Sequence, residues 1–184
     1  KTGLNIEGLL DLALEVAEAR SRRLPTAEVN EMLQEAMAAH PLEGHVQPLL
    51  SHRNKIDPKD SHLVYAARLA LREQLRLKES WQVIDNISLP KKAVRELADV
   101  CLGVRNEPSA DFLKSYLLDA EESVKRTRIF VHYIVRHGRE GSTAWVINFI
   151  GKKHSGDEAA QGMFLKALVQ ASQERGLKSS RNEL

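Results

Sequence analysis

Apolar residues recur along most of the chain at spacings of three and four residues, which is the period of an amphipathic α-helix. Two segments show this clearly, one after Pro25 and the other after Pro90. Their apolar stripes are Val29, Met32, Leu33, Ala36 and Met37 in the first and Ala93, Val94, Leu97, Ala98, Cys101 and Leu102 in the second. The pattern therefore predicts an all-α protein.

Capping residues and helix breakers divide this pattern into about nine or ten helices. Asp57-Pro58 and Ser155-Gly156-Asp157-Glu158 are typical helix starts, and Ser109 is expected to cap a further helix. Helix ends that favour a left-handed residue are expected at Gly103, Gly138 and Gly176.

The segment Thr127–Val135 is rich in residues that favour strands, but no second strand is apparent to pair with it, so we expect a helix there. Several consecutive helices look like antiparallel pairs, which predicts an irregular helical bundle or a short stacked helical-repeat (α-solenoid-like) array. The expected division is a helical pair over 1–45, a helical bundle or repeat domain over 46–176 and a flexible tail over 177–184.

Composition fits a globular helical protein inside the cell. Of the 184 residues, 42% are hydrophobic and 28% charged, and the 10 glycines and 6 prolines are too few for a fold with many tight turns. Cys101 is the only cysteine, which favours a reducing compartment. No apolar run approaches the roughly 20 residues that span a bilayer. We therefore expect a cytoplasmic protein without membrane contact.

Charge is unevenly distributed along the chain. Residues 1–45 contain four basic and eight acidic side chains, a net of −4, whereas residues 123–154 have seven basic side chains against Glu140, a net of +6. Aromatic residues such as Phe130, Tyr133 and Trp145 interleave with these cations. Cations neutralise phosphates and exposed aromatics stack on bases. The candidate contacts for a nucleic acid or another anionic partner are Lys125, Arg126, Arg128, Arg136, Arg139, Lys152 and Lys153.

The sequence contains no complete motif for metal, cofactor or nucleotide binding. Its seven histidines include no His-x-x-x-His pair. Gly151-Lys152-Lys153 lacks the preceding glycine and the strand context of a phosphate-binding loop. We therefore predict no catalytic residue, no metal and no cofactor.

The segment Tyr133-Ile134-Val135-Arg136-His137-Gly138 resembles the Arg-His-Gly signature of histidine phosphatases. That resemblance implies an enzyme in which His137 becomes phosphorylated and Arg136 binds phosphate. The chemistry also needs a second histidine and a general acid downstream, and His154 is the sole later histidine. The alternative, which we prefer, is a helix that ends at His137.

A second resemblance covers residues 2–41. It is carried by Thr2-Gly3, Gly8-Leu9-Leu10, Arg22-Arg23-Leu24-Pro25-Thr26, Asn30, Leu33, Ala36 and His40-Pro41. These residues are similar to one segment of Der (EngA) GTPases, tandem-GTPase ribosome-assembly factors, in which Thr-Gly lies near the end of the second GTPase domain and the Pro-Thr-x-x-x-Asn helix opens a KH-like, RNA-associated domain. The phosphate-binding glycines and the Asn-Lys-x-Asp guanine motif are absent, so the resemblance implies no GTPase activity here.

Residues 43–120 are similar, without a diagnostic motif, to helical regions of STAND-type NTPases. Both likenesses place the chain beside an NTPase domain. Our first hypothesis is therefore a non-enzymatic helical module that binds a protein partner, as a regulatory part of a larger NTPase, with Trp81 and Trp145 as candidate interface anchors. The alternatives are an RNA-binding module that uses residues 123–154 and a histidine-phosphatase-like enzyme.

Overall fold

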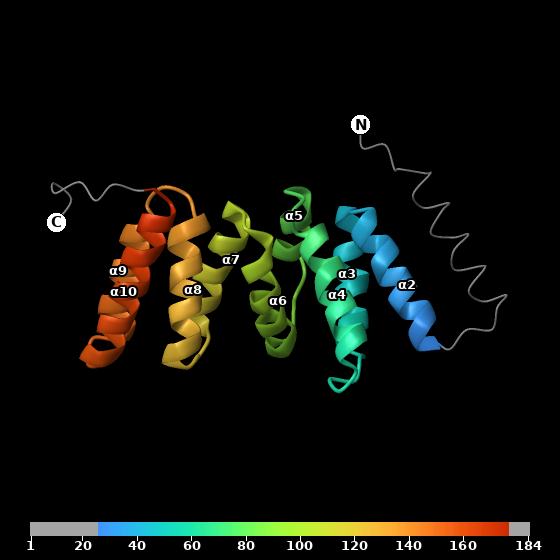
Figure 1. The fold of residues 1–184 in the computed structure, drawn as a ribbon, viewed down its shortest axis with the longest axis horizontal. Coiled ribbons are helices and arrows are strands. Elements are labelled where there is room, and N and C mark those ends of the chain that lie inside the picture. The colour runs from blue at the N-terminus through green and yellow to red at the C-terminus, as the bar shows by residue number, and fades with distance from the viewer. Residues whose placement is uncertain (1–25, 177–184) are drawn as a thin grey trace. The chain divides into compact units, whose positions relative to one another are not determined.

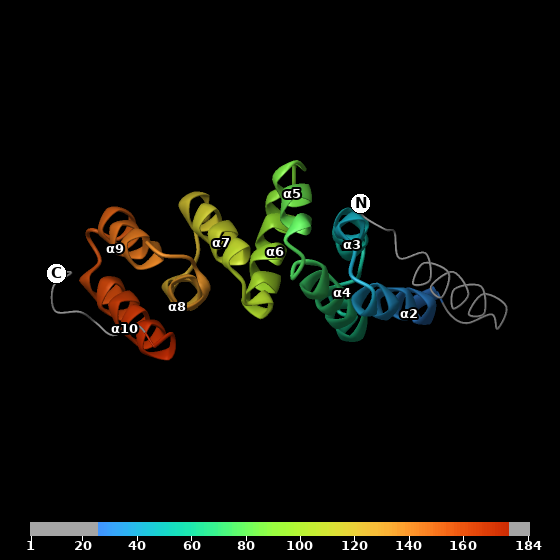
Figure 2. The same cartoon turned by 90° about the horizontal axis from the view of Figure 1, so that it is seen from above.

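The computed structural model describes residues 26–176, with side chains from Glu31 onwards (Figures 1 and 2). Within this range the structure is helical and contains no strand, so the predicted all-α fold is confirmed, including a helix over Thr127–Val135. The elements are α2 (Thr26–Ala39), the 3-10 helix η1 (Glu43–His45), α3 (Val46–Arg53), α4 (Ser61–Gln74), α5 (Glu79–Asp85), α6 (Lys91–Val104), α7 (Glu107–Asp119), α8 (Val124–His137), α9 (Ser142–Lys153) and α10 (Glu158–Glu174).

The chain divides into two compact units, and the boundary falls after Glu96, inside α6. This boundary does not coincide with the division expected near residue 45. The reason is that α2 packs along α4, which joins residues on both sides of the expected boundary into one core. The tail expected over 177–184 lies outside the described residues.

The first unit has a core of small and branched aliphatic side chains. Ala67, Ala70 and Leu71 of α4 have exposed fractions of 1% or less, as does Val46 of α3. Gln74 is also fully buried at the end of α4. Its Oε1 accepts a hydrogen bond from the Leu42 N–H at 2.6 Å, and its Nε2 donates to the Met37 carbonyl at 2.5 Å. One amide thus satisfies two backbone groups at the end of α2 and in the following loop.

The second unit is built around α8. Figures 1 and 2 show α8 beside α10, and α7 and α9 also pack against α8. Its buried side contributes Phe130, Val131 and Ile134, each with an exposed fraction of 1% or less. Phe130 meets the Tyr116 ring of α7 edge-on, with ring centroids 5.7 Å apart. The burial of this side of α8 leaves its opposite side exposed.

Helix starts use different residues from those expected. α4 is capped by Asp60, α7 by Asn106 and α10 by Asp157, each through a side-chain oxygen that accepts a backbone N–H. Asp57, Ser109 and Ser155 therefore do not act as the caps. A capping side chain must reach the N–H two or three residues on, and Asp60, Asn106 and Asp157 are the residues at that distance from the observed first turns.

Two of the three helix ends expected at glycines are confirmed. α8 ends at His137, directly before Gly138, and α10 ends at Glu174, shortly before Gly176, which has φ +72°. Gly103 lies inside α6, and the left-handed residue after that helix is Arg105, with φ +61°. Gly138 has an extended backbone with φ −74°. A side chain there would collide with Ser142 Oγ and with the Ile134 carbonyl, so close approach requires this glycine.

None of the helices in residues 26–176 is long and apolar enough to span a membrane.

We predict that Gln74→Leu lowers the free energy of unfolding of the first unit by about 1–3 kcal/mol, because it leaves the partly buried Leu42 N–H and Met37 carbonyl without the Gln74 side chain as partner. Urea unfolding followed by circular dichroism would measure the loss. Gln82→Leu is the control, since Gln82 is exposed on α5 and the change should stay within about 0.5 kcal/mol. Equal effects of the two substitutions would contradict the role given to Gln74.

Candidate basic surface on helix α8

The exposed side of α8 presents a row of basic residues. Lys125, Arg128, His132 and Arg136 are spaced three or four residues apart, which puts them on one face of the helix. Ile129 lies on the same face and has an exposed fraction of 43%. We call these five residues the basic stripe. Lys125 and Arg128 are exposed and have no ion-pair partner among the described residues.

Arg126 lies outside the stripe because its side chain is used internally. Its Nη2 is 2.8 Å from Asp99 Oδ1 of α6, and its Nε is 2.9 Å from Glu122 Oε2. The Glu122 side chain is only 2% exposed and also accepts a hydrogen bond from the Tyr116 hydroxyl. The guanidinium lies over the Phe130 ring at 5.4 Å from its centroid. Arg126 therefore neutralises a buried carboxylate and ties together α6, α7 and α8.

Lys153 is also used internally. Its ammonium donates to the carbonyls of Leu117, Leu118 and Ala120 at 2.6, 3.3 and 2.8 Å. These carbonyls lie at the C-terminal end of α7, where a helix carries unpaired acceptors and partial negative charge. Lys153 therefore caps α7 from the end of α9, whereas Lys152 is exposed and without a partner among the described residues.

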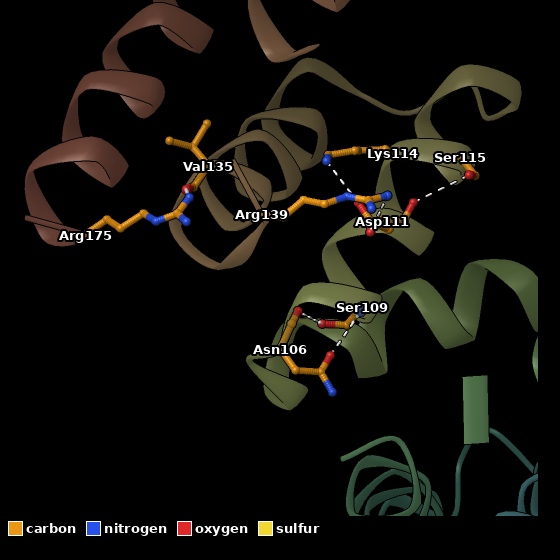
Figure 3. A network of polar contacts seen from close by, with 8 residues as sticks. All are labelled: Asn106, Ser109, Asp111, Lys114, Ser115, Val135, Arg139 and Arg175. Atoms are coloured by element: carbon orange, nitrogen blue, oxygen red, sulfur yellow. Dashed lines mark hydrogen bonds and ion pairs between the residues drawn. The ribbon is translucent and has the colours of Figure 1, made fainter. Parts of the chain in front are cut away.

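Arg139 lies in the loop after α8 and pairs with α7. Its Nη2 is 3.0 Å from Asp111 Oδ2, and Lys114 Nζ is 3.0 Å from the other carboxylate oxygen of Asp111 (Figure 3). The Arg139 side chain is nevertheless 66% exposed. Of the seven cations expected as contacts, Arg126, Arg136, Arg139 and Lys153 thus have internal partners. Lys125, Arg128 and Lys152 have none within residues 31–176.

At the end of α8 a carboxylate from α10 is held by the basic stripe. Arg136 Nη1 is 2.6 Å from Glu174 Oε2, and His132 Nε2 is 3.3 Å from the same oxygen. Gln170 donates to the other oxygen at 2.9 Å. The hydrogen bond from Gln170, together with the positive charge of Arg136, lowers the pKa of Glu174. Neither His132 nor Glu174 was predicted, because Glu174 comes from another helix and no local spacing indicates the pair.

His137 has a strongly cationic surrounding. Partial burial lowers its pKa first, and the charges of Arg136, Arg105, His132 and Arg175 lower it further. Its ring is tilted against that of Tyr133, with centroids 4.7 Å apart. Arg175 Nη1 donates to the Val135 carbonyl at 3.1 Å and so caps the end of α8 (Figure 3). The groups that lower the pKa of His137 thus come from α8, from the loop between α6 and α7 and from the residue after α10.

The aromatic residues expected to stack on bases are mostly in the core. Phe130 and Tyr133 have exposed fractions of 1% and 5%. The Tyr133 hydroxyl accepts from the Arg105 N–H and is 2.7 Å from Ser109 Oγ, so it fixes the start of α7, whose Asn106 cap is drawn in Figure 3. Trp145 is half-buried and stacks on Phe149, with ring planes 8° apart. The basic segment therefore presents few aromatic faces to solvent.

Trp81 is a core residue in the structure. It is 6% exposed, and its indole N–H donates to the Leu75 carbonyl at 2.9 Å. A buried and hydrogen-bonded indole is not accessible as an interface anchor, which corrects the expectation for Trp81. Trp145 keeps part of its surface accessible.

The last two helices carry a second accessible surface. Ile147 of α9 and Leu165 and Val169 of α10 have exposed fractions of 48%, 47% and 53%. Side chains with lower exposure, such as Phe149 and Phe164, form the core from the opposite sides of these helices. We call six uncharged exposed residues of this pair the outer face; its members are Ala144, Ile147, Gly151, Gly162, Leu165 and Val169. The exposed Asn148 and Lys166 lie on the same sides of α9 and α10.

Metal and thiol chemistry find no support in the part of the chain that is described. No group of three or more His, Cys, Asp and Glu side chains there could hold a metal ion. Cys101 is fully buried, and burial raises the pKa of its thiol well above the usual value. The thiolate that would react or bind metal is therefore disfavoured.

Comparison with known proteins finds one short similarity. The chain is 60% identical over 40 residues to GTPase Der of Thermomicrobium roseum, a match that covers 22% of this chain and 9% of that protein. This match confirms a resemblance to Der GTPases that is limited to a short segment. The matched length of 40 residues equals that of the segment 2–41. No family model and no solved structure matches the sequence.

We predict that Arg126→Gln lowers the free energy of unfolding by about 1–3 kcal/mol, because it leaves the Glu122 carboxylate buried without its cation. Arg128→Gln is the matched control, about half a turn further along α8. It should change stability by no more than about 0.5 kcal/mol, since Arg128 is exposed and unpaired in the described structure. Thermal or urea unfolding compares them, and a larger loss from Arg128→Gln would contradict this assignment.

We predict that the imidazole of His137 titrates below the ordinary value of 6.5 in an NMR titration, and that Arg136→Gln moves its pKa part of the way back. A histidine whose folded pKa is depressed destabilises the fold as pH falls through 6.5 towards the folded pKa. Between pH 7.5 and pH 5.5 the melting temperature of the His137→Gln variant should therefore fall less than that of the native chain. Identical losses would show that His137 is not in this cationic surrounding.

Proposed function

We propose that the chain is a non-enzymatic helical module that binds another protein through the outer face of α9 and α10. The observation that carries this proposal is the exposure of Ile147, Leu165 and Val169, each near one half, on two adjacent helices. The one charged residue on the same side of α10 is Lys166. Exposed apolar side chains that gather on a folded chain are typical of protein–protein contact.

The periodicity of the two helices supports this reading. α9 already buries one side through Val146 and Phe149, and α10 does so through Phe164 and Ala171. The apolar residues on the opposite sides are therefore not needed for the core of the second unit. A helix that is apolar on two sides is normally covered on both.

Small residues would let a partner helix approach closely. Ala144 and Gly151 lie on the α9 part of the outer face, and Gly162 lies on the α10 part. A side chain added at Gly151 or Gly162 would meet no atom within 4 Å. In repeat proteins, exposed end faces are closed either by polar capping repeats or by a further pair of helices. A partner that presents a helix or helix pair with aliphatic side chains fits this surface.

The phosphatase alternative finds little support in the geometry. His137 lies against Tyr133, whereas His154 lies against Phe149 and Phe164. The two histidines therefore have different neighbours, and the carboxylate beside the cations around His137, that of Glu174, is paired with Arg136. General acid catalysis of phosphoryl transfer would need a carboxylic acid within hydrogen-bond reach.

RNA binding is the second candidate function. It is supported by the exposed cations Lys125, Arg128 and Lys152 and by the limited similarity to a Der GTPase. It is weakened by the burial of Phe130 and Tyr133, since sequence-tolerant binding of single strands relies on exposed aromatic rings. A regulatory role beside an NTPase domain, in the cytoplasm, is the setting we propose for either function, because of that similarity and the single cysteine.

The test places the photo-crosslinking residue p-benzoyl-phenylalanine at position 165 and, as the control, at position 118 in chains expressed in cells. Leu118 lies on α7, outside the outer face. Its exposed fraction of 61% is at least as large as the 47% of Leu165, so a probe there is equally accessible. We expect a discrete protein adduct from position 165 that disappears with Val169→Asp, and none from position 118. No adduct at 165, or turnover of a nucleotide or phosphoester by the isolated chain, would contradict the proposal.

A further inference from the structure

We infer that the basic stripe of α8 is a docking surface for an acidic amphipathic helix of a partner protein. The inference rests on the proposed function as a protein-binding module, but it concerns a different face of the second unit and a defined partner chemistry. Nothing about the outer face of α9 and α10 is needed for it.

The geometry of the stripe suits a helix. From Lys125 to Arg136 the rise of an α-helix is about 16 Å, or three turns. The cationic positions recur every three or four residues, so a second helix laid along α8 would meet one of them at each of its own turns. A partner with acidic residues at the same spacing would match the open positions Lys125 and Arg128.

The chain's own Glu174 shows that the stripe binds carboxylates. Its two oxygens are held by Arg136 at 2.6 Å, His132 at 3.3 Å and Gln170 at 2.9 Å. Glu174 occupies the C-terminal end of the stripe. The N-terminal end, with Lys125 and Arg128, has no carboxylate against it among the described residues. With three permanent cations and one acid, the stripe keeps a net positive charge for a partner.

The middle of the stripe favours a protein over a nucleic acid. Ile129 is 43% exposed between Lys125 and His132 and offers an aliphatic contact. An acidic helix with one apolar residue among its acids would bury it. A base would need a ring to stack on, and Phe130 and Tyr133 are turned into the core with exposed fractions of 1% and 5%.

The experiment measures fluorescence anisotropy of the full chain with a labelled helical peptide of about 15 residues, in which glutamates recur at i, i+4, i+7 and i+11 around one leucine. A peptide with glutamine at those positions and a single-stranded RNA are the comparison probes. We expect the glutamate peptide to bind, to weaken as salt screens the charges, and to bind more tightly than either comparison probe.

The deciding variants are Lys125→Glu/Arg128→Glu and the control Lys91→Glu/Lys92→Glu. Both pairs are exposed and change the net charge equally, and the control pair lies at the start of α6 in the first unit. We expect the first pair to weaken peptide binding by at least about tenfold and the control by less than about twofold. Circular dichroism should show unchanged helicity in both.

Three outcomes would overturn the inference: no binding of the glutamate peptide at low salt, equal weakening by the two variant pairs, or tighter binding of the RNA. The last would make the stripe a nucleic-acid surface. A loss of the crosslink at position 165 with peptide binding intact would remove the proposed outer-face contact but leave the basic stripe. Loss of peptide binding with the crosslink intact would do the reverse.

Discussion

The burial of one side of α8 is the constraint on which the second unit depends. Phe130, Val131, Ile134 and Val135 have exposed fractions of 1% or less, and α7, α9 and α10 pack around them. Because side chains repeat every 3.6 residues, the burial of this side determines which residues can remain in solvent. The basic stripe consists of residues on the side of α8 that faces away from this core.

Cations close in sequence have different uses in this unit. Arg126 and Arg128 are two residues apart, yet Arg126 neutralises the buried Glu122 and Arg128 is exposed. Lys152 and Lys153 divide in the same way, since Lys153 caps α7 through three backbone carbonyls. A net charge counted along a segment therefore overstates the charge that a partner meets. Positive charge that remains accessible on α8 is confined to one face.

The second unit presents two surfaces of different chemistry. The outer face of α9 and α10 is uncharged and partly apolar, and the basic stripe of α8 is cationic with Ile129 in its middle. Apolar area supplies affinity, whereas charge complementarity mainly sets orientation and association rate. A partner that used both surfaces would gain from each, because the second contact forms within one complex. The short similarity to a Der GTPase covers too little of the chain to define a partner.

The sequence by itself determined the helical class and most helix positions. Apolar periodicity is a local property, and it indicated helices along most of the chain. The helix over Thr127–Val135 was expected because no second strand was apparent to pair with its strand-favouring residues, and Gly176 marked the expected end of the last helix. The seven cations were found for the same reason, as a run of charges. Caps were missed by a few residues because several polar residues precede each helix and only the final backbone path selects one of them. The pairing of Arg126 with Asp99, of Lys153 with the end of α7 and of Arg136 with Glu174 was decided by tertiary structure alone. Each of these contacts joins residues from different helices, and only packing brings such residues within the few ångströms over which charges and hydrogen bonds act.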